Sequence, residues 1–79
     1  MQATPMRWES PTRWYEARLG TDLFGHRILT CCWGARGGGR GGMKCWPVAD
    51  ETAAERLLAA LARRRERHGY RAVAMPVRG

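Results

Sequence analysis

The sequence predicts an α+β fold, in which a small antiparallel β-sheet of four to five strands packs against one α-helix that lies across one face. Polar and apolar residues alternate along residues 13–19 and 26–33, as is typical of half-buried strands. Apolar residues recur at helical spacing in the C-terminal half, which predicts one amphipathic helix. A chain of 79 residues has room for one hydrophobic core. We therefore expect a single domain over residues 6–75, with flexible tails at 1–5 and 76–79.

The N-terminal part of the domain predicts two strands and a turn. Residues 6–9 form a short edge strand that ends before Pro11, because proline cannot donate a hydrogen bond to a strand ladder. Residues 13–19 form a strand with a period of two. One of its faces carries Trp14, Glu16 and Arg18, and the other carries Tyr15, Ala17 and Leu19. The turn that follows is bounded by glycines, and we expect its Leu23 and Phe24 to fold back onto the core.

Two further strands flank a glycine-rich loop. In residues 26–33, one face carries Arg27, Leu29, Cys31 and Trp33, and the other carries Ile28, Thr30 and Cys32. Residues 43–48 form the next strand, and Pro47 marks its end as an edge or a stop. The two strands are expected to make a hairpin with the glycine-rich loop at its tip.

The helix is the clearest element of the sequence. Asp50 is a good N-cap, although Thr52 and Glu55 also have the form of a capping box that would begin the helix two residues later. The apolar stripe consists of Ala54, Leu57, Leu58 and Leu61, with Ala62 at its margin. Gly69 is placed to end the helix as the C′ residue, and residues 70–75 form a last short strand.

The charge balance points to a polyanionic partner. The chain has fourteen basic and seven acidic residues, which gives a net charge of +7. All but one of the basic residues are arginine, which binds phosphate in bidentate fashion and stacks on bases and aromatic rings. This composition favours nucleic acid first and an acidic protein or membrane surface second. The alternative interpretation is a charge that serves solubility alone.

Several other function classes are disfavoured. Cys31, Cys32 and Cys45 have no CxxC spacing, so we expect free thiols in a reducing cytoplasm, and neither a disulfide framework nor a metal site. Three glycines of the loop match a dinucleotide-binding fingerprint, but a strand follows where that motif needs a helix, so no cofactor is expected. The sequence has no paired-carboxylate site and no apolar run long enough to span a membrane. We therefore expect a cytoplasmic protein that is not an enzyme and does not bind membranes.

The stretch from Trp33 to Gly42 is the main candidate binding site. It holds six of the ten glycines and no acidic residue. Bare backbone N–H groups, the guanidiniums of Arg36 and Arg40 in two RGG triplets, and the ring of Trp33 suit a phosphate chain and a sugar or base face. Trp33 is either a stacking platform or a core residue, and we expect the adjacent Gly34 to leave one face of its ring uncovered. The alternative for the whole stretch is a flexible hairpin tip with solvated charges.

A second group of arginines lies near the end of the helix. Its members are Arg63, Arg64, Arg65 and Arg67. They form either a second phosphate-binding patch or a solvated face that complements the helix dipole. The loop and this patch can hold one ligand only if they lie on the same side of the molecule, which the sequence leaves open.

Taken in order, these segments resemble a WGR domain, and more narrowly the short stand-alone WGR proteins of bacteria. The resemblance covers roughly residues 6–72. It is carried by Trp14-Tyr15, Asp22-Leu23-Phe24-Gly25, Trp33-Gly34, the glycine-basic loop, the capped helix with Ala54 and Leu57, and His68-Gly69-Tyr70. The resemblance implies an antiparallel sheet packed on one helix. It also implies DNA binding at strand breaks, with a motif tryptophan that stacks at the DNA end and basic residues that hold the phosphates.

Carried over to this chain, the stacking role falls on Trp33 and the phosphate role on Arg36, Arg40 and Lys44. The third motif position, normally arginine, is Ala35, and Arg36 can replace it only if the loop shifts by one residue. This departure puts one family contact in doubt.

We therefore predict a non-enzymatic nucleic-acid-binding module that prefers DNA to RNA and binds ends or nicks. The predicted contact residues are Trp33, Gly34, Arg36, Arg40, Lys44, Arg13 and Arg63. The alternative is a protein-interaction adaptor that presents its arginines to an acidic protein partner.

Overall fold

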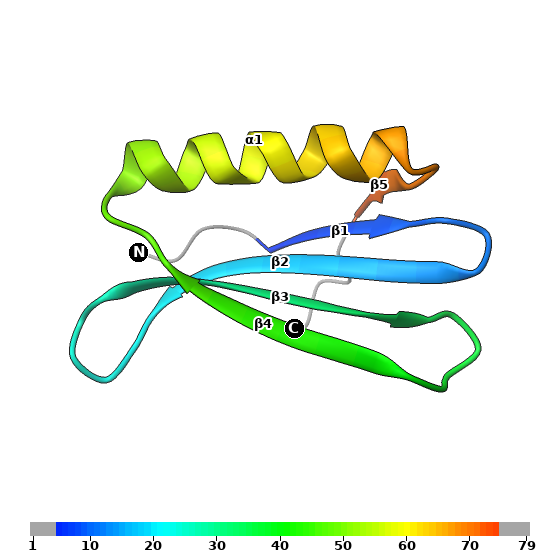
Figure 1. Cartoon of the computed structure of the whole chain (residues 1–79), viewed down its shortest axis with the longest axis horizontal. Helices are drawn as coiled ribbons and strands as arrows, with labels where there is room; N and C mark the ends of the chain where they lie inside the picture. The colour runs from blue at the N-terminus through cyan, green and yellow to red at the C-terminus, as the bar shows by residue number, and fades with distance from the viewer. Residues whose placement is uncertain (1–4, 75–79) are drawn as a thin grey trace.

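A computed structural model describes residues 5–74 and contains a five-stranded antiparallel sheet with one helix (Figure 1). The strands are β1 (Met6–Glu9), β2 (Arg13–Thr21), β3 (Arg27–Ala35), β4 (Gly41–Pro47) and β5 (Arg71–Val73), and the helix is α1 (Glu51–Arg67). The order across the sheet is β4-β3-β2-β1-β5. This arrangement confirms the predicted α+β class and the single helix. The predicted tails, except for Pro5, lie outside the described residues.

The β3–β4 hairpin takes up part of the stretch that was predicted to be a loop. Trp33 pairs with Gly42, and Gly34 pairs with Gly41, so the ladder extends into the glycine-rich stretch. The exposed tip is reduced to residues 36–40, and Gly38 and Gly39 adopt positive φ angles of 91° and 106° there. The prediction of one continuous loop over residues 34–42 was therefore wrong at both ends.

The helix begins and ends where its capping residues indicate. The Asp50 carboxylate accepts a hydrogen bond from the Ala53 backbone N–H at 2.8 Å, so the helix begins at Glu51 and not two residues later. At the other end, Gly69 has a φ of 86°, as expected for the C′ residue. The chain then turns directly into β5, which pairs with β1 at the sheet edge opposite β4.

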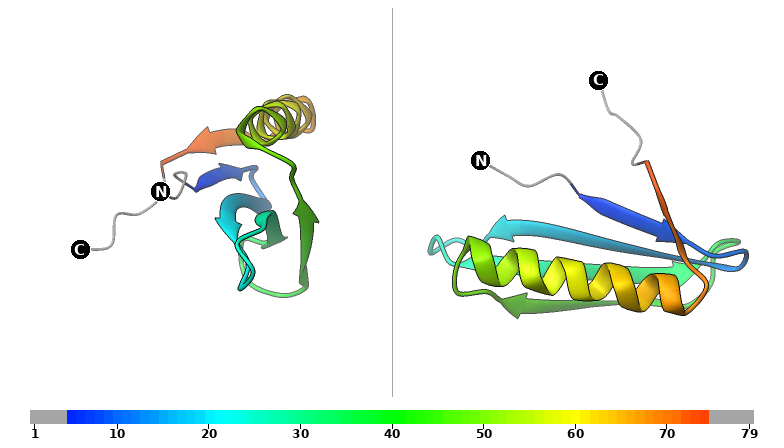
Figure 2. Two further views of the ribbon diagram at one scale, coloured as in Figure 1. Left: turned by 90° about the vertical axis from the view of Figure 1, so that its left-hand side faces the viewer. Right: turned by 90° about the horizontal axis from the view of Figure 1, so that it is seen from above.

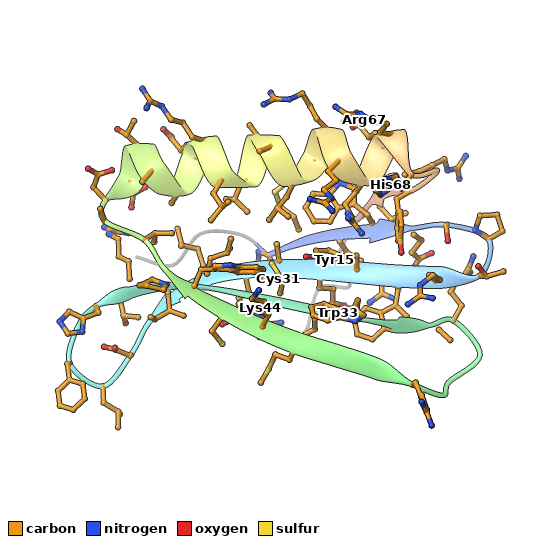
Figure 3. The ribbon with its side chains drawn as sticks, in the orientation of Figure 1. Tyr15, Cys31, Trp33, Lys44, Arg67 and His68 are labelled. Atoms are coloured by element: carbon orange, nitrogen blue, oxygen red, sulfur yellow. The ribbon has the colours of Figure 1, made fainter. Side chains whose placement is uncertain are left out.

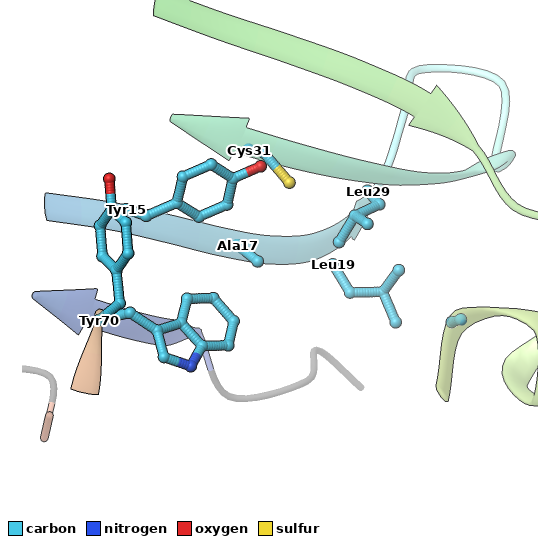
Figure 4. Packing of buried hydrophobic residues seen from close by; sticks show 8 residues of the cluster. Tyr15, Ala17, Leu19, Leu29, Cys31 and Tyr70 are labelled. Atoms are coloured by element: carbon cyan, nitrogen blue, oxygen red, sulfur yellow. The ribbon is translucent and has the colours of Figure 1, made fainter. Parts of the chain in front are cut away.

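The core lies between the helix and one face of the sheet (Figures 2 and 4). Its buried residues are Trp8, Tyr15, Ala17, Leu19, Leu29, Cys31, Ala54 and Tyr70. The strand faces predicted for residues 13–19 and 26–33 are confirmed, because Tyr15, Ala17 and Leu19 share the core side with Leu29 and Cys31. The helix contributes its apolar stripe, most of it half-buried against this core.

The β2–β3 turn contradicts the expectation that its apolar residues fold onto the core. Leu23 is 98% exposed and Phe24 is 83% exposed. The Asp22 carboxylate accepts hydrogen bonds from the backbone N–H groups of Phe24 and His26, both at 2.9 Å. The turn is thereby closed on itself beyond the end of the sheet, and its side chains project into solvent.

Candidate nucleic-acid interface

The fold brings the two arginine-rich segments to the same end of the molecule. The β3–β4 tip, the β1–β2 turn and the C-terminal end of α1 lie together, whereas the β2–β3 turn and the helix N-terminus lie at the opposite end (Figure 1). That opposite end carries the carboxylates of Asp22, Asp50 and Glu51 and one arginine, Arg27, which forms an ion pair with Glu51. Charge is therefore segregated along the long direction of the domain, with the excess of cations around the hairpin tip and the helix end.

A groove of about 640 Å³ opens at this basic end, between the C-terminal half of α1 and strands β2 to β4. Its volume lies within the usual range of ligand sites. Aromatic and apolar side chains make up one part of the lining: Tyr15, Trp33, Trp46, Leu61 and Tyr70. Basic side chains make up the rest: Arg13, Lys44, Arg64, Arg65 and His68. The groove therefore offers flat apolar surface and positive charge side by side.

Trp33 is half-buried in the wall of this groove. One face of its indole stacks on Tyr15, with ring centroids 5.9 Å apart and an interplanar angle of 11°. The glycine beside its ring is Gly42 on the neighbouring strand, where an added Cβ would lie 2.6 Å from the indole. The expectation that Gly34 uncovers this ring was wrong. Gly34 is buried on the other face of the sheet, where an added Cβ would meet the indole of Trp14 at 3.0 Å.

The two predicted cations Arg13 and Lys44 lie with Trp33 in the groove. Lys44 stands on the core side of the sheet because its register partner is the buried Cys31 (Figure 3). Its ammonium lies 5.3 Å from the ring centroid of Trp46, at the distance of a cation–π contact. Neither Arg13 nor Lys44 has a carboxylate partner among residues 5–74.

The remaining predicted cations lie elsewhere. The Arg36 guanidinium lies 3.7 Å from the Glu9 carboxylate and donates a hydrogen bond to the Ser10 carbonyl oxygen at 3.3 Å, so it points to the β1 side. Arg40 is exposed at the hairpin tip and has no carboxylate partner in the described part of the chain. Arg63 lines a second depression on the helix with Arg67, and this depression adjoins the groove through the shared Arg64 and His68. The structure therefore does not bring all the predicted contact residues together on one surface.

The sequence placed Leu61 in the apolar stripe and Arg64 and Arg65 in a general arginine patch, without joining them into one surface. Leu61, Arg64, Arg65 and His68 follow helical spacing and continue the apolar stripe of the core-facing side. Figure 3 shows His68 on the sheet side of the helix end and Arg67 on the opposite side. The spacing alone could therefore have separated the groove arginines from the solvated ones.

Arg65 is held in the groove by aromatic rings and has no acid partner in the described chain. Its guanidinium carbon lies 4.5 Å from the ring centroid of Tyr15 and 5.2 Å from that of Tyr70. Its buried Nε–H has no hydrogen-bond acceptor among residues 5–74. Contact with the two tyrosine rings fixes the position of this guanidinium beside the groove.

Burial shifts the pKa values of two core side chains, Cys31 and Tyr15. Burial raises the pKa of the Cys31 thiol and raises the pKa of Tyr15 from 10.0 to about 12, so both stay neutral near pH 7.

All three cysteines are free, and residues 5–74 contain no cluster of three or more metal-ligating side chains. In the same residues, no helix has the length and apolar character needed to cross a membrane.

Comparison of the chain with protein-family models, with curated proteins and with solved structures finds no match.

Proposed function

We propose that this chain is a non-enzymatic nucleic-acid-binding module with a WGR-like fold, and that it binds DNA ends or nicks. The observation that carries the proposal is the groove at the basic end, where Trp33 shares one surface with Arg13, Lys44, Arg64 and Arg65. A nucleic acid offers phosphates, which bind cations that have no acid partner, and base or sugar faces, which stack on flat rings.

The preference for ends and nicks follows from stacking. Inside an intact duplex, both faces of every base pair are covered by its neighbours, so a protein ring can stack only where a terminal or unpaired base or sugar is accessible. The half-buried indole of Trp33, backed by Tyr15, is a rigid surface for such a contact. The surrounding cations would then hold the adjoining phosphates.

Salt-dependent binding to nicked, blunt-ended and single-stranded DNA tests the proposal. Fluorescence anisotropy should give an affinity that falls with salt, with a log–log slope of about −3 to −4 if about four phosphates are neutralised. Nicked or blunt-ended DNA should bind more tightly than a closed circular duplex. Absence of binding at low salt would refute the proposal.

A pair of matched variants tests the groove itself. Lys44→Ala with Arg64→Ala should weaken binding about tenfold or more and reduce the slope by about 2, since each lost phosphate contact removes about 0.9. Arg18→Ala with Arg56→Ala removes the same charge from exposed positions outside the groove and should leave binding nearly unchanged. Equal losses in both variants would show that only net charge matters. Arg36→Ala with Arg40→Ala tests the hairpin tip separately.

The alternative function, an adaptor for an acidic protein, would use the same cations without the aromatic ring. Replacing Trp33 with leucine should abolish discrimination between nicked and closed DNA if stacking matters. Capture of one stoichiometric acidic protein after nuclease treatment, unaffected by that replacement, would instead favour the adaptor.

A further inference from the structure

The exposed apolar pair of the β2–β3 turn is the feature that nucleic-acid binding does not use. Leu23 and Phe24 are the two most exposed large apolar residues of the described chain, at 98% and 83%. They stand on an ordered turn, because Asp22 accepts two backbone hydrogen bonds and lies 3.3 Å from His26 Nδ1. Gly25 completes the turn with a φ of 81°. A rigid turn presents these side chains at little further cost in conformational entropy.

The surroundings of this pair are opposite in charge to the groove. The pair lies at the end that carries Asp22, Asp50 and Glu51 against one arginine, Arg27, which pairs with Glu51, so the formal charge there is net negative. The groove with its basic rim lies at the other end of the same domain (Figure 1). An apolar projection on an end with net negative charge matches an aromatic groove with a basic rim. The two surfaces lie at different ends of one chain, so they can meet only between copies.

We propose that the Leu23–Phe24 turn of one copy inserts into the groove of a second copy, against Trp33 and Trp46, and that the chain associates head to tail. Such a contact is heterologous and leaves a free turn and a free groove at its two ends, so it builds open chains of copies. Two inserted side chains make a small interface, which is expected to be weak and reversible. The proposal does not depend on nucleic-acid binding.

Sedimentation velocity of nuclease-treated protein tests this association. The average mass should rise above the 8.9 kDa of one chain as the concentration increases from about 10 μM to about 1 mM, the range of weak association. Leu23→Ser with Phe24→Ser should remain at 8.9 kDa at every concentration. Met43→Ser removes a 67% exposed apolar side chain on the other face of the sheet and should associate as the wild type does. A wild type that stays monomeric throughout, or a turn variant that still associates, overturns the proposal.

Mixing two association-defective variants distinguishes head-to-tail contact from nonspecific hydrophobic association. Lys44→Glu with Arg64→Glu reverses charge at the groove rim but keeps the turn, whereas the serine variant keeps the groove but loses the turn. Each alone should stay monomeric, and an equimolar mixture should form a species of twice 8.9 kDa and nothing larger. A mixture that stays monomeric while the wild type associates contradicts the proposal.

The serine variant also keeps the two proposals separate. Its turn lies far from the nucleic-acid groove, so its affinity for nicked DNA should equal that of the wild-type monomer. A serine variant that no longer self-associates but still binds DNA would support both proposals. A wild type that binds DNA but does not self-associate would refute only the head-to-tail association.

Discussion

Replacing Gly42 with alanine should destabilise the domain through the ring of Trp33. The added Cβ would lie 2.6 Å from Cζ2 and 2.8 Å from Cε2 of the indole, closer than carbon atoms approach in folded proteins. The ring cannot withdraw freely, because it stacks on Tyr15 with centroids 5.9 Å apart. Either the indole or strand β4 must therefore move.

Overpacking of this kind costs about 1–3 kcal/mol. For a domain of this size, each kcal/mol lowers Tm by about 4–8 °C. Gly37→Ala is the matched control from the same glycine-rich stretch. No heavy atom lies within 4 Å of its added Cβ, so its effect should stay within about 0.5 kcal/mol. Gly41→Ala should cost at least as much as Gly42→Ala, because its Cβ would overlap the backbone carbonyl of Trp33.

Thermal unfolding followed by circular dichroism and tryptophan fluorescence measures these differences. The expected order of stability is Gly37→Ala above Gly42→Ala, with Gly41→Ala no more stable than Gly42→Ala. Equal Tm values for the Gly37 and Gly42 variants would refute the reasoning, because they would mean that β4 does not press on the indole. A lower affinity of Gly42→Ala for nicked DNA, measured well below its Tm, would connect this packing to the groove.

Three further predictions concern the helix, the core and the thiols. Asp50→Ala should lower the free energy of unfolding by about 1 kcal/mol, and Thr52→Ala by less than about 0.5 kcal/mol, in urea titrations, because only Asp50 caps the helix. Folding raises the pKa of Tyr15 from its usual 10.0 to about 12. The stability that depends on the neutral phenol is therefore complete below pH 10 and is lost between about pH 10 and 12. Tyr15→Phe should therefore reduce the loss of stability in that interval, as followed by urea titrations at each pH. A thiol reagent should modify exposed Cys45 in the native protein and buried Cys31 only on unfolding, with mass spectrometry identifying the site; rapid native labelling of Cys31 would contradict this packing.

Local patterns were sufficient for most of the fold. The inward face of residues 13–19, the N-cap at Asp50 and the helix end at Gly69 depend on neighbours within a few positions, and all three predictions are confirmed. The predicted α+β class with one helix is confirmed for the same reason. Strand limits were less accurate, because the ladder between β3 and β4 is set by pairing partners that the pattern of either strand does not contain.

The candidate site was only partly accessible from the sequence. Of the seven predicted contact residues, Trp33, Lys44 and Arg13 line the groove, whereas Arg36 lies near Glu9, a residue 27 positions earlier in the chain. A contact across that separation has no local signal.

By itself, the sequence of this protein determined its secondary structure, its caps and its excess of positive charge, because these depend on composition and on residues close together in the chain. Only the tertiary structure decided where that charge gathers and which side chains the glycines pack against. Sheet pairing places Gly41 and Gly42 against Trp33, and the direction of α1 carries its arginines to the hairpin tip rather than away from it. The same pairing carries Leu23 and Phe24 beyond the core and into solvent, because the turn that holds them is closed by its own hydrogen bonds.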